Sequence, residues 1–217
     1  MAVPAQRTLP VFPLPDVVLF PHVRLPLHVF ELRYRQLVRD ALAGEREIAI
    51  ATLKPGWEQD YAGSPAFHEL ACVGRFEQVQ WRTDDCYDLV LTGVRRVRLG
   101  AVRQEFPYRA CASEDLPEQP HEGGDPLAEM ERHALLAELR RLLPFGAQAW
   151  RTSPGAAPDA GLETLVNAMA HALRIETSAR LELLALDSVL DRAQRLHSHL
   201  RHIRLAPPSE GDAFERN

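Results

Sequence analysis

Lysine is almost absent from this chain of 217 residues. Its 25 basic residues are arginines apart from Lys54, and they face 30 Asp and Glu, so the formal net charge is −5. A phosphate-binding P-loop needs a lysine directly before Ser or Thr, but Lys54 precedes Pro55. A Ser–Lys protease dyad needs a desolvated lysine, and a turn beside Pro55 and Gly56 is a poor place to desolvate one. We therefore expect neither ATP hydrolysis nor proteolysis, and we predict that the chain is not an enzyme.

Long apolar runs are also missing. The most apolar early stretch, Val11–Leu27, is interrupted by prolines and charged residues, whereas a bilayer-spanning helix needs roughly eighteen or more apolar residues. No basic segment followed by an apolar run opens the chain. We therefore predict no secretory signal, no membrane partner and a cytoplasmic location.

Cysteine and histidine offer no metal site. Cys72, Cys86 and Cys111 are widely spaced and form no C-x-x-C pair, which argues against a disulfide framework and against a cysteine zinc site. His199 and His202 would lie on one side of a helix, but two ligands do not make a zinc site and no H-E-x-x-H motif occurs. We predict three reduced cysteines, no metal and no cofactor.

The first half of the chain has the period of β-strands. Apolar and polar residues alternate in Glu47–Leu53, where Ile48 and Ile50 share a face, and in Tyr87–Thr92. Five prolines from Pro10 to Pro26 require short or kinked strands, which suit an irregular barrel better than a flat sheet. Apolar residues at helical spacing between Phe30 and Leu42 predict one helix within this half.

The second half is helical. Residues 116–124 hold almost nothing to bury, so they predict a linker. Asp125 and Pro126 then supply an N-cap and a first-turn proline for a helix, and further amphipathic stripes follow, the last behind Asp187 as its candidate N-cap. We predict a β-rich subdomain over 8–115, a linker over 116–124, a helical subdomain over 125–205 and a disordered tail over 206–217.

Two sets of residues are candidates for binding. Trp57 and Tyr61 lie in one loop and Trp150 in another, and large aromatic side chains on loops either tuck back onto the core or present a surface to a partner. Arg95, Arg96 and Arg98 belong to the most basic stretch, which would suit a nucleic-acid site. The strand pattern divides the arginines of this stretch between two faces, however, which leaves ordinary salt-bridged sheet surface as the alternative.

Several runs of residues carry a family resemblance. Near the N-terminus they are Leu9-Pro10-Val11-Phe12-Pro13-Leu14, then Asp16–Pro21 and Leu25–Glu31, followed by Arg33 and Tyr34. Later in the chain they are Val73-Gly74, Leu91–Val97 and Leu181–Leu184 ahead of Asp187. With these motifs the chain from about Thr8 to Leu205 resembles the N-terminal domain of Lon proteases.

The resemblance implies an α+β fold in which a PUA-like β pseudo-barrel with one helix is followed by a C-terminal helical bundle. It also implies a role in recognising polypeptides. Full Lon proteases add ATPase and Ser–Lys protease modules, whereas this sequence stops at Asn217, so we do not expect those activities to carry over. We interpret the motif residues as structural: Phe20, Leu25, Leu27 and Phe30 as barrel core, and Gly93 as a close backbone approach or bulge.

The function we predict is therefore a non-catalytic module that binds unfolded or exposed apolar polypeptide segments, or a separate protein partner. The binding groove would lie between the barrel and the helices and would be lined by Trp57, Tyr61 and Trp150. The alternative is an RNA-binding PUA-like protein that uses Arg95, Arg96 and Arg98.

Overall fold

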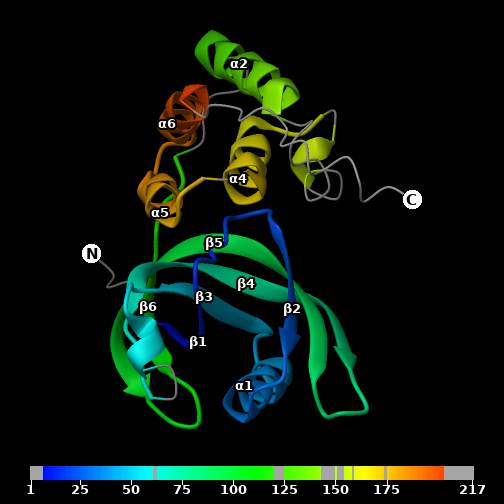
Figure 1. Ribbon diagram of the computed structural model, residues 1–217, viewed down its shortest axis with the longest axis vertical. Helices are drawn as coiled ribbons and strands as arrows, with labels where there is room; N and C mark the ends of the chain where they lie inside the picture. The colour runs from blue at the N-terminus through cyan, green and yellow to red at the C-terminus, as the bar shows by residue number, and fades with distance from the viewer. Residues whose placement is uncertain are drawn as a thin grey trace, which may run out of the picture.

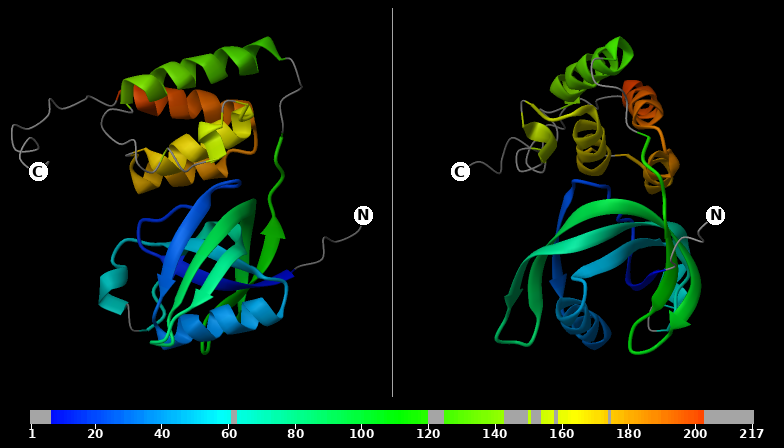
Figure 2. Two further views of the ribbon diagram at one scale, coloured as in Figure 1. Left: turned by 90° about the vertical axis from the view of Figure 1, so that its right-hand side faces the viewer. Right: turned by 180° about the vertical axis from the view of Figure 1, so that it is seen from behind.

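Two subdomains are stacked end to end in the computed structural model, which describes residues 7–60, 63–119, 125–142, 150, 154–157, 159–173 and 175–202. The strands form a barrel, and the C-terminal helices lie together beyond one end of it (Figures 1 and 2). The predicted fold class, a β pseudo-barrel with one helix followed by a helical bundle, is confirmed. In this part of the chain no helix is both long and apolar enough to cross a membrane.

Six strands form the sheet in the order β2-β5-β4-β3-β1-β6, and a second pairing of β5 with β6 closes it into a barrel. The long strand β5 makes both pairings because residues 87–92 pair with β2 and residues 97–104 pair with β6. Strands β1 and β3 run parallel, and the other pairs are antiparallel. The strands are β1 (Arg7–Leu14), β2 (Arg24–Val29), β3 (Glu47–Leu53), β4 (Phe67–Trp81), β5 (Tyr87–Gln104) and β6 (Ala110–Asp115).

Strand β3 is buried on both faces because it lies in the middle of the sheet, between β1 and β4. Ile48 and Ile50 share one face, as their spacing predicts, and belong to the larger core cluster. Ala49 and Ala51 lie on the opposite face in a second cluster formed within the strands. The small alanine side chains leave room on that face for larger residues of other strands, such as Val97 and Leu99 of β5.

Helix α1 (Leu32–Ala43) covers the end of the barrel that lies away from the C-terminal helices (Figure 1). Tyr34 on its buried face meets Phe12 of β1 edge-on, with ring centroids 4.4 Å apart. The predicted helix is confirmed. Phe30, however, is 59% exposed and not part of the core, because it precedes the helix and stacks on the ring of His28.

Gly93 allows the segment between β1 and β2 to lie directly against β5. The Gly93 N–H donates to the Val23 carbonyl, and the Gly93 carbonyl accepts from the His22 N–H, both at 2.8 Å. A Cβ atom on Gly93 would stand 2.0 Å from the Phe20 carbonyl oxygen. The predicted close backbone approach at Gly93 is confirmed.

Four helices and a short 3₁₀ turn make up the described part of the helical subdomain. As predicted, Asp125 caps the first helix, since its Oδ1 accepts from the Leu127 N–H at 2.9 Å. The last helix is capped by Ser188, whose Oγ accepts from the Asp191 N–H at 3.1 Å, and not by Asp187 as predicted. The elements are α2 (Pro126–Leu142), η3 (Pro154–Ala156), α4 (Leu162–Ala172), α5 (Thr177–Ala185) and α6 (Val189–Arg201).

Buried charges join the two subdomains. Arg96 of β5 and Arg192 of α6 are both fully buried. The Glu118 carboxylate lies between them, 2.5 Å from Arg96 Nε and 3.0 Å from Arg192 Nη2. Asp187 also binds Arg96, at 2.9 Å from Nη2. The Asp187 carboxylate is therefore occupied by an ion pair, which explains why the neighbouring Ser188 caps α6.

The same cluster reaches the segment between β1 and β2. Arg192 Nη1 donates to Asn167 Oδ1 at 3.0 Å, and Asn167 Nδ2 donates in turn to the Pro21 carbonyl at 3.2 Å. Arg96 Nη1 donates to the Leu184 carbonyl at 2.9 Å. Because these buried donors are satisfied across the boundary, the helices are held to the barrel in one orientation.

The first part of the expected linker is an ordered stretch. The Leu116 N–H donates to the Arg96 carbonyl at 3.0 Å, and Gln119 forms a parallel β-bridge with Ser188. We expected residues 116–119 to be a linker because they hold almost no apolar side chain to bury. They are ordered instead by the Glu118 carboxylate, which binds two buried arginines. Residues 120–124 and the expected tail over 206–217 lie outside the described residues.

Gly93→Ala should lower the free energy of unfolding by roughly 1–3 kcal/mol, because the added methyl group must push backbone aside. Gly100→Ala on the same strand is the matched control. Its Cβ would lie 3.7 Å from the Ala112 carbonyl oxygen, an ordinary contact, so we expect a change of about 0.5 kcal/mol or less. Urea unfolding of both variants measures the difference. Equal urea midpoints for the Gly93→Ala and Gly100→Ala variants would contradict the close backbone approach at Gly93.

Glu118→Gln should lower the free energy of unfolding by roughly 3–5 kcal/mol, because two buried guanidinium groups lose the carboxylate they share. Glu114→Gln removes the same charge from an exposed position on β6 and should change stability by about 0.5 kcal/mol or less. Urea unfolding followed by circular dichroism compares the two variants. A loss no larger for Glu118→Gln than for Glu114→Gln would show that Glu118 does not join the subdomains.

Candidate functional site

The aromatic residues predicted to line one groove are not brought together. Trp57 is half-buried in the short helix η1 (Trp57–Asp60), which lies beside the barrel and away from the helical subdomain (Figure 1). Trp150 is only 7% exposed and belongs to the core cluster, with its ring close against Gly155. The structure therefore corrects the role expected of Trp150, whose indole is a packing group that a partner does not reach. Tyr61 lies outside the described residues.

The three arginines of the nucleic-acid alternative do not form a basic surface. Arg96 is fully buried in the ion-pair cluster. Arg95 binds Glu47 at 2.8 Å and Asp115 at 3.0 Å, and of the three only Arg98 is exposed. Carboxylates neutralise two of these charges, which leaves little to attract phosphate groups. The structure contradicts a nucleic-acid surface built on Arg95, Arg96 and Arg98.

Cysteine and histidine form no metal centre in the described residues, where no group of three or more His, Cys, Asp or Glu side chains could hold an ion. The three cysteines are buried free thiols. Burial raises the pKa of Cys72 to about 12, so its reactive thiolate form is suppressed. His197 and His199 lie within ion-pair distance of glutamates, at 3.2 Å and 3.4 Å.

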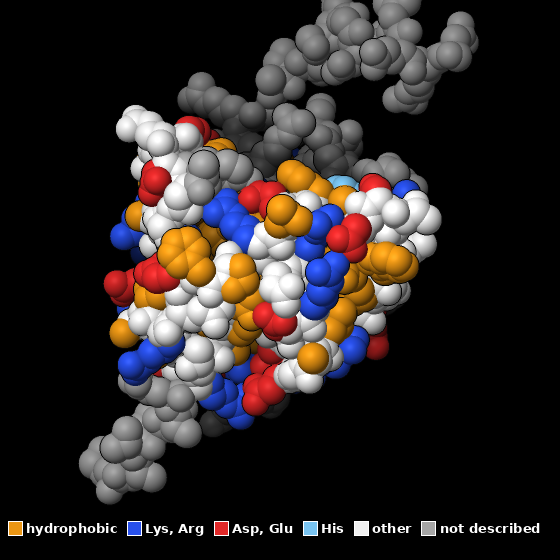
Figure 3. All heavy atoms as spheres, turned by 90° about the horizontal axis from the view of Figure 1, so that it is seen from below, with side chains coloured by type: hydrophobic (Ala, Val, Ile, Leu, Met, Phe, Trp, Pro, Cys, Tyr) orange, Lys and Arg blue, Asp and Glu red, His pale blue; other side chains and the backbone are white. Residues whose placement is uncertain are grey.

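Exposed apolar side chains gather at the end of the barrel that α1 covers. Phe106 in the loop between β5 and β6 is 87% exposed, Leu32 at the start of α1 is 75% exposed, and Trp81 near the tip of the β4–β5 hairpin is 65% exposed. With Phe30 they define what we call the basal face. Figure 3 looks onto this end of the molecule and shows hydrophobic side chains lying between basic ones. A contiguous exposed apolar patch is typical of interaction surfaces, so the part of this face where Leu32 and Phe106 border one hollow is the candidate site.

Two hollows flank Phe106 and Pro107 on the basal face. The first, of about 760 Å³, is open to solvent and is bounded by Leu32 and the outer side of α1 opposite Phe106 and Pro107. The second, of about 270 Å³, lies on the other side of Arg33 and runs toward Gly63. Binding pockets commonly measure about 300–1,000 Å³, so the first hollow is large enough for several side chains of a bound peptide.

Hydrogen bonds fix the Phe106 loop relative to α1. The Tyr108 hydroxyl donates to Asp40 of α1 at 2.8 Å, and burial together with this bond raises the pKa of Tyr108 to about 12. The Gln104 side chain donates to the Tyr108 carbonyl at 3.1 Å. Arg33 reaches the other side of the face and donates to the Gly63 carbonyl at 3.2 Å. The exposed apolar groups therefore stand on a support that is already ordered, which reduces the entropy lost on binding.

The Asp85 carboxylate on the basal face binds several donor groups. Asp85 at the hairpin tip lies 3.1 Å from Arg35 and 2.8 Å from Arg39, and it accepts from the Trp81 indole N–H at 3.2 Å. The Trp81 hydrogen bond, with help from the two arginines, holds the pKa of Asp85 below its usual range. The outer side of α1 is therefore bound to the hairpin through ionised groups.

Sequence reasoning missed Phe106 and Leu32. Leu32 stands between Glu31 and Arg33, off the apolar stripe that α1 buries, and Phe106 directly precedes Pro107 where β5 has ended. A large apolar residue outside a helix's buried stripe, and an aromatic residue in a turn, are the signals that could have identified them.

A fixed barrel with one end joined to helices and the other exposing apolar groups among arginines has the architecture of a binding module. The chain belongs to the ATP-dependent protease La (LON) substrate-binding domain family, whose model matches residues 8–202. The family predicted from the N-terminal motifs is thereby confirmed.

Sequence matches to Lon proteases support membership of this family, and each match covers only part of the relative. The chain is 32% identical over 112 residues to Lon protease 2 of Myxococcus xanthus and 27% identical over 163 residues to Lon protease of Anaeromyxobacter dehalogenans. These matches cover 50% and 75% of this chain, but only 13% and 18% of those proteins. The chain thus corresponds to a small part of each relative.

Solved structures share the fold. The crystal structure of a Lon N-terminal domain protein from Xanthomonas campestris matches with a TM-score of 0.64 and 24% identity, over 88% of this chain and 98% of that one. The N-terminal domain of Mycobacterium avium complex Lon protease matches with a TM-score of 0.65 and 18% identity, over 91% and 100% of the two chains. At these identities the likeness shows the fold alone.

Replacing Trp150 should cost far more stability than replacing Phe106. Trp150→Ala should lower the free energy of unfolding by roughly 3–5 kcal/mol, because it opens a cavity in the core. Phe106→Ala should change it by about 0.5 kcal/mol or less, because the ring is exposed. Thermal unfolding followed by circular dichroism measures both. A Trp150→Ala protein as stable as the parent would contradict the packing role.

Proposed function

We propose that the chain is a recognition module that binds unfolded polypeptide segments on its basal face. One observation carries the proposal: Phe106 and Leu32 are exposed across an open hollow, in a chain that belongs to a family of substrate-binding domains. Each exposed apolar group keeps apolar surface in contact with water. A bound apolar side chain would cover that surface, and the favourable free energy is roughly 25 cal/mol for each Å² removed from water.

The open shape of the hollow suits unfolded polypeptide better than a small molecule. A small-molecule pocket encloses most of its ligand, whereas this hollow has an exposed ring on one side and an exposed leucine on the other. Two apolar anchors on a fixed support accept many sequences, because hydrophobic contact is not directional. An extended segment can place alternate side chains against such anchors.

The loop that carries Trp57 and Tyr61 extends the proposed surface. Gly63 and Ser64, which follow these residues in the chain, border the second hollow, and the Ser64 hydroxyl donates to Glu105 beside Phe106 at 3.3 Å. We include Trp57 in the proposed surface, and the binding role predicted for Tyr61, which lies outside the described residues, stays a prediction. Trp150 is left out because it is buried.

In this proposal the module itself catalyses nothing. It captures exposed apolar segments, and cleavage of peptide bonds, which the names of the relatives suggest for those proteins, is performed by other modules or by a separate protein partner. We place the module in the cytoplasm, where unfolded chains would be its ligands. Nucleic acid is not part of the proposal, since two of the three arginines that would have bound it, Arg95 and Arg96, are engaged with carboxylates.

Replacing both Phe106 and Leu32 by alanine should weaken binding of an unfolded polypeptide by roughly 1–4 kcal/mol, the range for apolar interface anchors. The measurement is a fluorescence-anisotropy titration of a labelled, reduced and alkylated model protein, with thermal unfolding of each variant alongside. Stability should stay close to that of the parent because both side chains are exposed.

Met130→Ala is the matched control, because Met130 is 58% exposed on α2 at the opposite end of the molecule. It should bind like the parent. Unchanged binding in the Phe106/Leu32 double variant, or an equal loss in Met130→Ala, would contradict the basal face as the binding surface.

A further inference from the structure

Two strand edges in the described part of the sheet have no strand beside them. One is the outer edge of β2, which stands at the end of the sheet order. The other belongs to β4, which pairs with β3 only as far as Arg75, after which the Phe76 N–H donates to the Arg46 carbonyl at 3.1 Å. The stretch Glu77–Trp81 is therefore paired with β5 alone, and we call its free side the β4 edge. Figure 1 shows the β4–β5 hairpin projecting beside the barrel with β4 outermost.

The β4 edge directs backbone hydrogen-bonding groups away from the sheet. The Arg82 N–H donates across the hairpin turn at 2.9 Å, and the register with β5 is unbroken from Gln78 to Trp81. Residues of an antiparallel strand alternate between facing the partner strand and facing away from it. The N–H and C=O groups of Val79 and Trp81 therefore face away from β5. An extended main chain carries the matching donors and acceptors.

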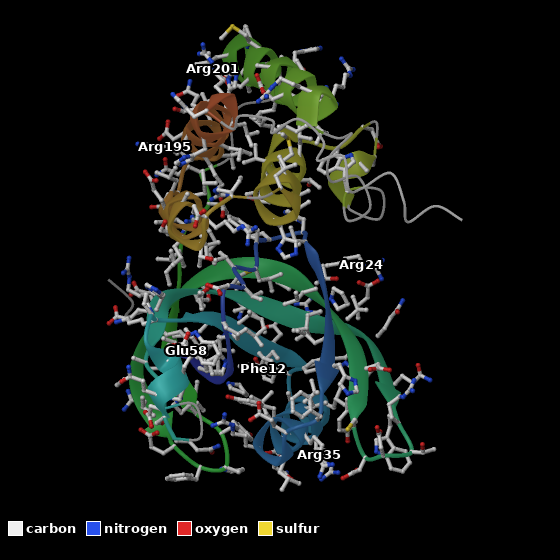
Figure 4. The ribbon with its side chains drawn as sticks, viewed as in Figure 1. Phe12, Arg24, Arg35, Glu58, Arg195 and Arg201 are labelled. Carbon is white, nitrogen blue, oxygen red and sulfur yellow. The ribbon has the colours of Figure 1, made fainter. Side chains whose placement is uncertain are left out.

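The β2 edge is closed to strand addition by a proline, whereas the β4 edge is not. By the same alternation Val90 faces β4, so Pro26, which pairs with Val90, faces away from β5 and supplies no N–H there. The β4 edge contains neither proline nor lysine, the residues that commonly protect an edge. Its charged residue, Glu77, is bound to Arg24 of β2 at 3.0 Å, and Figure 4 shows Arg24 pointing away from the interior of the barrel. The chain therefore blocks one edge and leaves the other available.

One face of the β4 edge offers apolar side chains. Val79 packs against the core and is partly buried, and Trp81 is 65% exposed. These two side chains share a face because side chains alternate along a strand. Gln78 and Gln80 on the opposite face are exposed and uncharged. A strand added at this edge would find apolar contacts at every second position and no charge to match.

We propose that the β4 edge takes up an extended segment of an unfolded polypeptide as an added β-strand. Main-chain groups of the segment pair with those of Val79 and Trp81, and its alternate apolar side chains lie against the same two residues. Because Trp81 belongs to the basal face, the edge continues that face. This inference rests on the proposed function and assigns it a substrate class: β-forming segments that are apolar at every second position and contain no proline.

A second copy of the chain fits the β4 edge less well than an unfolded segment does. The edge is one short strand, ~17 Å long at about 3.4 Å for each residue of Glu77–Trp81. Stable protein interfaces bury about 1,200–2,000 Å² in total, which one such strand pair does not provide. The edge therefore suits a ligand that is bound and released.

Amide hydrogen exchange followed by NMR tests the inference on the unaltered chain. The probe is a peptide of alternating valine and threonine with Gly-Ser at each end. Exchange at the Val79 and Trp81 amides should slow in proportion to the fraction of protein bound, roughly tenfold when about nine tenths is occupied. The His28 amide, which faces outward on the β2 edge, is the internal control and should exchange as before.

A methylated peptide separates main-chain pairing from side-chain contact. The same valine–threonine sequence with methyl groups on its central backbone nitrogens keeps its side chains and loses its donors. It should bind at least about tenfold more weakly in a fluorescence-anisotropy titration, because several main-chain hydrogen bonds are lost together.

Two variants of Val79 make the same separation on the protein. Val79→Pro removes one outward N–H and no hydrogen bond to β5, and it should weaken binding of the unmethylated peptide roughly five- to tenfold. Val79→Ala is the matched comparison, because it shortens the side chain and keeps the N–H, and it should lose clearly less, about two- to threefold. Thermal unfolding shows whether both variants remain folded at the temperature of the titration.

Unchanged exchange at Val79 and Trp81 with saturating peptide, or equal binding of the methylated peptide, would overturn the inference. Slower exchange that depends on protein concentration without peptide would overturn it too, because the occupant would then be a second copy. If unfolded protein binds, the Phe106/Leu32 double variant loses that binding and exchange at the β4 edge stays unchanged, the proposed function stands and only strand addition is wrong. If neither the peptide nor unfolded protein binds, both proposals fail.

Discussion

The arrangement of the molecule depends on the Glu118 carboxylate between two fully buried guanidinium groups. Burying an arginine is unfavourable unless its charge is paired and its donors are satisfied. Arg96 belongs to the barrel, Arg192 to the last helix, and Glu118 to the segment between the subdomains, so the charges are paired only when all three parts are in place. The cluster therefore selects one docking geometry out of the many that apolar contact alone would permit.

This docking leaves the two ends of the barrel with different roles. At one end, the segment between β1 and β2 lies against Gly93, and its Pro21 carbonyl accepts from Asn167 of α4. At the other end α1 covers the barrel with one face and leaves arginines and Leu32 on its outer side. The helices hold one end of a rigid support, and the opposite end is free to meet a partner.

Local patterns predicted the elements well because they report local environment. The helical spacing before Gly44, the cap at Asp125 and the close approach at Gly93 all depend on neighbouring residues or on one steric requirement, and all three are confirmed. The pairing of Arg96 with Asp187 was not foreseen because it joins residues 91 positions apart. No periodicity distinguishes an arginine that faces water from one that a distant helix will bury.

The candidate site was predicted less well than the fold, and for a related reason. Trp150 was a reasonable surface candidate as an aromatic residue on a loop, and only the packing of the helical subdomain shows that it is enclosed. Phe106 follows β5 closely in the sequence, and only the closure of the barrel shows that it lies past the last pairing of β5 and β6 and is exposed. Exposure is a property of the assembled molecule, and sequence patterns report it only indirectly.

The buried cluster also orders events during synthesis of the chain. Arg96 and Glu118 emerge from the ribosome well before Asp187 and Arg192, and at ~5–20 residues per second the 91 positions from Arg96 to Asp187 take roughly 5–20 seconds to make. Once β6 has been made the strands are complete, but for the rest of that interval Arg96 lacks its partner Asp187 and the segment around Phe20 lacks its cover. The docking end of the barrel therefore stays without its charge partners until α6 has been made.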